Sequence, residues 1–140
     1  MSEPTVVRLV IPVPAGEVIS GNSRTVWQAT HRMTLALVAR GRAAVLALGR
    51  PKFDGPVTRH VTIYYPDASR RRDAENYRPT VKALQDGAVR AGLLVDDDDD
   101  HVSDVGLVRG DPTEGLPPST LRISRLTRAF VFVLEYRARG

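Results

Sequence analysis

The sequence of 140 residues has no cysteine and only three scattered histidines, His31, His60 and His101. It can form neither a disulfide bond nor a thiolate zinc site, so a bound metal ion would need oxygen ligands. It also lacks an uninterrupted apolar run of the roughly 18 to 20 residues that cross a membrane. The first four residues do not combine a basic start with an apolar stretch, as a signal peptide does. We therefore expect a soluble, cytoplasmic protein with no membrane partner.

Aromatic side chains are scarce as well, with one Trp, four Tyr and three Phe, most of them at positions expected in strands or in the core. So few rings argue against a surface on which the bases of single-stranded nucleic acid stack. The length and the 42% hydrophobic content predict one domain over residues 1–140, built on one ordinary core.

Acidic residues are concentrated in one place. Six of the 16 lie in Asp96–Asp100 and at Asp104, which leaves 10 acids against 20 bases in the rest of the chain. A basic surface attracts the phosphate backbone of nucleic acid, whereas an acidic patch on it repels phosphate unless cations bind there. This contrast favours metal-assisted phosphodiester chemistry over simple binding. Eighteen of the bases are arginines, which suit bidentate phosphate contacts but are also expected from the codon bias of a GC-rich genome.

Hydrophobic periodicity predicts a mixture of strands and helices. A long helix is expected at 25–48 despite Gly41, and a Gly/Pro-rich loop at 110–119. The expected strands are 6–13, 57–65 and 102–108, with one or two more from 121–126 and 129–136.

The clearest helix is expected at 76–91, where apolar residues recur at intervals of four, three and four on one face. Gly92 follows it as a C-terminal cap. Pro79 fits only in the first turn, so the helix begins either close to Asn76, which would be its N-cap, or at Pro79 itself.

Bases and acids meet where this helix begins, in the sequence RRRDAEN. In an extended approach Asp73 and Glu75 point to the same side, so together they could bind one Mg²⁺ or Mn²⁺ ion. Phosphate would then lie beside the helix N-terminus and Arg70, Arg71 and Arg72. The alternative is structural, since the two acids could instead favour the helix dipole and pair with neighbouring arginines.

The second acidic feature is the run of five aspartates before His101. An EF-hand loop that opens at Asp96 is excluded, because its sixth and twelfth positions are His101 and Leu107 instead of glycine and glutamate. Two readings stay open. The run is a solvated loop with no function, or one or two of its members complete a three-carboxylate cluster with Asp73 for phosphodiester hydrolysis.

The helix between the two acidic features carries Arg78 and Lys82 on one face with Glu75 and Asp86. A lysine near metal-bound phosphate can stabilise the charge of the transition state. The alternative is a surface ion pair of Lys82 with Asp86, four residues later.

Taken in order, RRRDAEN, then KALQDG from Lys82, then AGLLVDD ending at Asp97, resemble the core signature of RusA-type Holliday-junction resolvases. In that family an arginine-rich turn leads to Asp-x-Asp-Asn, a helix carries a lysine and an aspartate, and a Gly-hydrophobic-Asp-Asp segment follows. The resemblance spans about residues 6–108 and includes a loop asparagine like Asn22. It implies an α+β fold, a single domain with a mixed β-sheet of about four strands packed with two main helices.

The resemblance also implies an activity, the Mg²⁺-dependent (or Mn²⁺-dependent) cleavage of four-way DNA junctions, often in proteins of phage origin. Carried over residue by residue, the catalytic set is Asp73, Glu75, Lys82 and Asp97. The metal ligands are the three acids of that set, with Asp96 as a further candidate. The residues expected to contact DNA are Arg70, Arg71, Arg72, Asn76 and Arg78.

Three departures from the family pattern matter. Glu75 replaces an aspartate, the spacing from Asn76 to Lys82 is about one helical turn longer than expected, and the long acidic run leaves the third ligand open among Asp96–Asp99. The first departure keeps a catalytically inactive branched-DNA-binding protein as an alternative. An interaction module whose acidic loop docks on a basic partner is another.

Chain length limits how the site can close. At about 1.5 Å per residue a helix over 76–91 covers roughly 22 Å, while the five residues 92–96 return at most about 17 Å. Either the helix begins later, at Pro79, or a partner chain supplies part of the site. Members of the family act as homodimers, and a two-fold dimer would place two sites on symmetric strands of a junction.

Overall fold

A four-stranded sheet with the strand order β1-β4-β2-β3 organises the computed structural model of the protein. The structure describes residues 3–21, 27–67, 73–111 and 114–139. The strands are β1 (Val6–Pro14), β2 (Val57–Tyr64), β3 (Val102–Arg109) and β4 (Ala129–Ala138). The helices are α1 (Trp27–Ala47), α2 (Arg78–Arg90) and α3 (Pro118–Thr127), with short 3₁₀ helices η1 (Ala15–Glu17) and η2 (Ala74–Tyr77).

The sheet is mixed, because β4 pairs antiparallel with β1 and β2, whereas β3 pairs parallel with β2. The parallel pair requires a crossover, and the chain from β2 to β3 makes it through η2 and α2. The expected α+β fold with about four strands and two main helices is therefore confirmed, and the described residues form a single domain.

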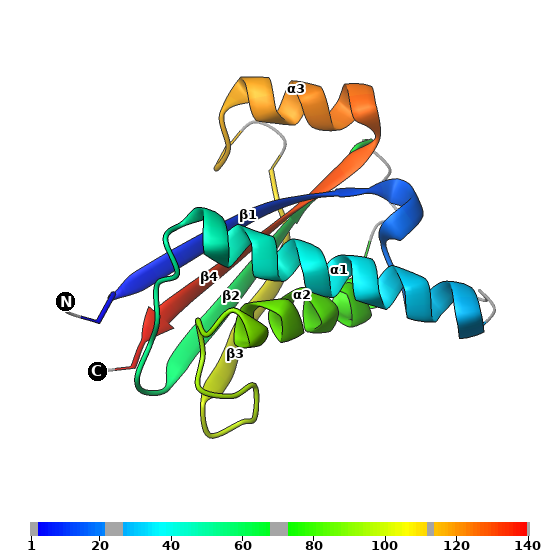
Figure 1. The fold of residues 1–140 in the computed structure, drawn as a ribbon. Coiled ribbons are helices and arrows are strands. Elements are labelled where there is room, and N and C mark those ends of the chain that lie inside the picture. Colours follow the sequence, from blue (N-terminus) through cyan, green and yellow to red (C-terminus); the bar gives the residue numbers. More distant parts are fainter. Residues whose placement is uncertain (1–2, 22–26, 68–72, 112–113, 140) are drawn as a thin grey trace.

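The two long helices cover one face of the sheet and α3 lies against the other (Figure 1). Side chains alternate between the faces. Phe132 and Leu134 of β4 join the core beneath α1 and α2, whereas Val131 and Val133 pack with Leu121 of α3. Thus β4 is buried on both sides, and the sheet positions the start of α2 beside β3.

Two glycines bring α1 and α2 together. A Cβ atom at Gly41 would lie 2.0 Å from the carbonyl oxygen of Leu84, and one at Gly87 would lie 2.0 Å from that of Val38. The backbones thus approach more closely than any side chain permits. The glycine that seemed to weaken the predicted helix at 25–48 is the residue that lets α1 pack against α2.

The start of α2 agrees with the expectation that Pro79 lies in the first turn, but the expected cap is not formed. The helix begins at Arg78 with Pro79 in its first turn, and Asn76 lies within η2 instead of capping the helix. The prediction of Asn76 as N-cap was wrong, because Asp73 caps η2 and this extra turn precedes α2. Gly92, with φ +88°, ends the helix as expected.

The prediction of a strand at 121–126 was also wrong, since these residues belong to α3. Pro118 occupies the first turn of the helix, where its missing N–H is not needed. Leu121 and Ser124, three residues apart, are buried on the face toward the sheet, while Ile123 and Leu126 are exposed. The helix begins inside the stretch expected to be a loop at 110–119. The strand expected at 129–136 is confirmed as β4.

Candidate functional site

A cleft of about 460 Å³ opens beside α2, between that helix, strand β2 and the acidic loop. Three of its lining side chains are basic and one is acidic. The lining residues are Arg59, Arg78, Pro79, Val81, Lys82, Gln85 and Asp97. Two residues of the expected catalytic set, Lys82 and Asp97, thus meet in one cleft.

Lys82 lies between two carboxylates. Its Nζ atom is 3.6 Å from Oδ2 of Asp97 and 3.9 Å from Oδ1 of Asp86. The lysine is 73% exposed, whereas the side chains of Asp97 and Asp86 are 31% and 36% exposed. The surface pair expected as the structural alternative therefore exists, but it is extended by an aspartate 15 residues further along the chain.

The carboxyl groups of Asp86 and Asp97 are close enough to share one proton through a hydrogen bond. Burial, reinforced by this contact, raises the pKa of Asp86. The same hydrogen bond and the charge of Lys82 hold the pKa of Asp97 below its usual range, against the effect of burial. A proton therefore resides on Asp86 first, and Asp97 remains an ionised carboxylate that faces the cleft.

The other aspartates of the run have different contacts. Oδ1 of Asp96 accepts a hydrogen bond from the backbone N–H of Asp97 at 2.7 Å. Asp98 accepts one from the backbone N–H of His101 at 3.0 Å and lies 2.6 Å from its Nδ1 atom. Asp99 and Asp100 are exposed. Asp97 is the member of the run for which a side-chain contact with Lys82 of α2 is seen, at 3.6 Å.

Asp73 and Glu75 lie at the start of the same helical segment and make structural contacts. Oδ1 of Asp73 accepts a hydrogen bond from the backbone N–H of Glu75 at 3.1 Å, which caps η2. Both carboxylate oxygens of Glu75 bind the guanidinium of Arg78, Oε1 at 3.1 Å from Nη2 and Oε2 at Nε. Nη1 of Arg78 donates to Asp104 of β3 at 2.8 Å. The two acids thus do what the structural alternative expected, capping a helix and pairing with an arginine.

No three acidic or histidine side chains in the described part of the chain lie close enough together to hold one metal ion. Asp73 and Glu75 therefore do not join Asp97 in this conformation of a single chain, and the three-carboxylate set stays a prediction. The chemistry of the donors still suits magnesium, which is usually held by one or two carboxylates, waters and substrate phosphate. Asp97 is one such oxygen donor in the cleft, and Asp86 lies beside it on the other side of Lys82.

The remaining predicted residues have mixed positions. Arg70, Arg71 and Arg72 lie outside the described residues, as does Asn22. The backbone carbonyl of Asn76 accepts a hydrogen bond from Gly21 at 2.6 Å, which ties the loop after β1 to η2.

Three residues that sequence reasoning missed lie side by side across the sheet. Arg59 of β2 pairs with Asp104 of β3 and with Tyr136 of β4. Directly after Asp104 the register shifts by one residue, which is a β-bulge of the kind that re-aims neighbouring side chains. The sequence did carry a signal for Arg59. Alternate residues of a strand point to the same face, so Arg59 lies on the face of β2 that the buried Val57 and Val61 occupy. A charged residue on the apolar face of a strand calls for a partner or a function.

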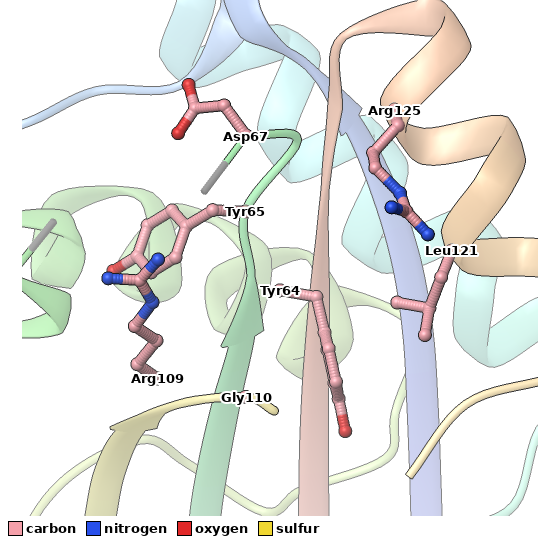
Figure 2. Close-up of a pocket in the computed structure, with 7 residues that line it drawn as sticks. All are labelled: Tyr64, Tyr65, Asp67, Arg109, Gly110, Leu121 and Arg125. Atoms are coloured by element: carbon pink, nitrogen blue, oxygen red, sulfur yellow. The ribbon is translucent and has the colours of Figure 1, made fainter. Parts of the chain in front are cut away.

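A second, smaller cavity of about 160 Å³ lies where β2 and β3 end, next to α3. Figure 2 shows the guanidinium of Arg109 across the ring of Tyr65, with Arg125 on the other side of Tyr64. The carbon atom Cζ of Arg109 is 5.2 Å from the centre of that ring, a cation–π contact. The residues that line this cavity are distinct from those of the cleft beside α2.

Comparisons with known proteins assign the chain to no family. No protein-family model matches the chain, and no curated protein matches it. Among solved structures, the periplasmic domain of MotB is similar with a TM-score of 0.40 and 12% sequence identity, over 99% of this chain and 78% of that chain. A likeness of this degree carries no conclusion about function. In the described part of the chain, none of the helices has the length and apolar character that a membrane crossing requires.

Proposed function

We propose that this chain is a Mg²⁺-dependent endonuclease that resolves four-way DNA junctions by phosphodiester hydrolysis, acts as a homodimer and is related to RusA-type resolvases. The observation that carries the proposal is the distance of 3.6 Å between Lys82 Nζ and Asp97 Oδ2, in a cleft that Arg59 and Arg78 also line. These two residues are 15 positions apart in sequence and match the lysine and the third acid of the family signature. Their meeting is what a shared catalytic site requires.

The roles follow from the contacts. Asp97 supplies an ionised carboxylate for a divalent cation, and Mg²⁺, when bound, would polarise the scissile phosphate and its attacking water. Lys82 is exposed and long enough to stabilise charge on the phosphate oxygens as the bond to the leaving oxygen breaks. Arg78 lines the cleft, so exchange of Glu75 for a DNA phosphate on its guanidinium would free the second acid of the set.

The chain path removes one obstacle to this site. The return from Gly92 brings Asp97 within 3.6 Å of Lys82, which lies one turn into α2. Asp73 and Glu75 precede that start by only a few residues. The remaining gap is one that a local change at η2, or a homodimer partner, could close.

A catalytically inactive branched-DNA-binding protein is the second candidate. The observation that favours it is the engagement of both Glu75 oxygens by Arg78, which neutralises the acid that also departs from the family pattern. Binding of a junction that is unaffected by Mg²⁺ and yields no nicked product would support this candidate.

The test is Asp97→Asn, which removes the ionised carboxylate from the cleft and preserves its shape. Loss of a metal ligand costs several kcal/mol of transition-state stabilisation, so we expect cleavage of a labelled four-way junction to fall by about 100-fold or more. Binding of the junction should persist. The matched control is Asp99→Asn, an exposed member of the same acidic run, which should cut at the normal rate. Full activity in Asp97→Asn would remove the site assignment.

A further inference from the structure

Arg59 is a nearly buried cation on the wall of the cleft. Its side chain is only 12% exposed, and it lies on the central strand β2 under α2. Enclosing a guanidinium is costly unless its donors and its charge are satisfied. The question is therefore how well the surrounding residues satisfy Arg59.

The compensation is incomplete. Nη1 donates to Oε1 of Gln85 at 3.0 Å, but the nearest carboxylate oxygen, on Asp104, is 3.5 Å from Nη2. The same oxygen is only 2.8 Å from Arg78, which also binds Glu75. Arg78 is thus paired with two carboxylates, whereas Arg59 has only the Asp104 carboxylate, which it shares with Arg78 and which lies farther from it. Among the described residues, the enclosed Nε atom of Arg59 has no hydrogen-bond partner.

The guanidinium is nevertheless held in a fixed orientation. The hydroxyl of Tyr136 donates to the same Gln85 oxygen at 2.8 Å. Burial raises the pKa of Tyr136, so this hydroxyl stays protonated and remains a donor. With two donors on its oxygen, the Gln85 amide is fixed with that oxygen toward Arg59. A cation held in this way loses little entropy when it binds an anion.

We propose that Arg59 contacts a phosphate group of the DNA strand that enters the cleft. Arg59, Arg78 and Lys82 line the same volume of about 460 Å³, which is in the range that accommodates a nucleotide. The inference rests on the proposed function and adds to it a phosphate contact from β2, which lies outside the three motifs RRRDAEN, KALQDG and AGLLVDD. The ligand that we expect at Arg59 is a phosphodiester group of a DNA strand that runs along α2 in the cleft.

The experiment compares the wild-type protein with Arg59→Gln in binding a fluorescent four-way junction, measured with EDTA so that no strand is cut. Salt is varied from about 50 to 200 mM, because each phosphate contact adds roughly one to the slope of log Kd against log salt. We expect Arg59→Gln to weaken binding about tenfold and to lower this slope by about one. The control is Arg122→Gln, which removes the same charge from an exposed position of α3 and should leave the slope unchanged.

Two further variants keep the inference testable if Arg59→Gln fails to fold. Arg59→Lys retains the charge without the planar fork, and Tyr136→Phe retains Arg59 while freeing the Gln85 amide. We expect the first to keep the salt slope and lose affinity, and the second to lose affinity by a few-fold at an unchanged slope. Wild-type affinity in folded Arg59→Gln, or in both Arg59→Lys and Tyr136→Phe, would overturn the role of Arg59 and leave the proposed function standing. A wild-type protein that neither binds nor cuts the junction would overturn both.

Discussion

At the residue scale, the cleft is a chain of alternating charges in which each acid has a specific partner. Arg78 bridges Glu75 and Asp104, and Lys82 bridges Asp86 and Asp97. Exposed ion pairs contribute little to stability, so these contacts are not expected to dominate the folding free energy.

Asp104, which lies between Arg78 and Arg59, gives a stability prediction. Burial alone would raise the pKa of Asp104, but the hydrogen bond from Arg78 and the charge of Arg59 hold it below the usual value. A carboxyl group whose pKa is lowered on folding stabilises the folded state above its unfolded pKa of about 3.9, and that stabilisation is lost as pH falls through the folded pKa. We therefore expect Asp104→Asn to lower the free energy of unfolding by about 1 kcal/mol from pH 5 to 7, since the group is partly exposed.

The measurement is denaturant unfolding of Asp104→Asn and wild type across pH. The difference between them should shrink below about pH 4. Asp54→Asn, which removes a carboxylate that is 73% exposed, is the control and should show no such pH dependence. A difference for Asp104→Asn that stays constant down to pH 2 would contradict the assigned ion pairs.

Sequence reasoning found part of this cleft and could not find the rest. Lys82 and Asp97 were predicted because they stand in a recognisable order along the chain. Arg59 and Asp104 become neighbours through parallel strand pairing between β2 and β3, and a bulge then adjusts the position of Asp104. Strand order and bulges are long-range features that local periodicity does not contain. The engagement of Glu75 by Arg78 was left open as an alternative, because a helical spacing of three allows both pairing and metal binding.

At the element scale, the close contact of α1 and α2 fixes where the cleft lies. The two helices cross at Gly41 and Gly87, and α2 presents Lys82 and Asp86 away from α1 toward the acidic loop. The position of the α2 face that we propose to be catalytic therefore depends on two glycines outside the proposed site.

Gly41→Ala tests this packing. Its added methyl group would lie 2.0 Å from the Leu84 carbonyl oxygen, so the helices must move apart. We expect the free energy of unfolding to fall by about 1 to 3 kcal/mol, the usual cost of overpacking, although alanine is the better helix former. Gly16→Ala is the control, because a Cβ atom there meets nothing within 4 Å, and it should be close to neutral. Unchanged or increased stability in Gly41→Ala would show that α1 and α2 are not in this contact.

Most elements were predictable because their hydrophobic periods are clear. In β1 every buried position is apolar, although Val6 and Val10 are apolar and exposed, and α2 carries its apolar stripe toward the sheet. The stretch 121–126 was misassigned because it is short and begins with apolar and polar residues in alternation, so its period is ambiguous. A tertiary contact favours the helix instead, because it places Leu121 against Val131 and Val133 of β4.

At the scale of the whole molecule, the net charge of +4 conceals a basic body with one acidic loop. The structure folds that loop back against α2, so that Asp97 meets the basic wall of the cleft instead of extending into solvent. A phosphate backbone attracted to the basic surface would thus be led to the cleft where we propose that a divalent cation binds. This arrangement is the physical basis of the proposed metal-dependent cleavage.

Cleavage of DNA by the wild-type protein tests this account most directly. An end-labelled four-way junction and a linear duplex of the same sequence are incubated with the protein in Mg²⁺ or in EDTA, and the strands are separated on a denaturing gel. We predict paired nicks at symmetric positions of the junction in Mg²⁺, no products in EDTA and an intact linear duplex. A junction that is bound yet uncut in both Mg²⁺ and Mn²⁺ would contradict the proposed catalysis, and absence of binding would contradict the assignment of the cleft to DNA.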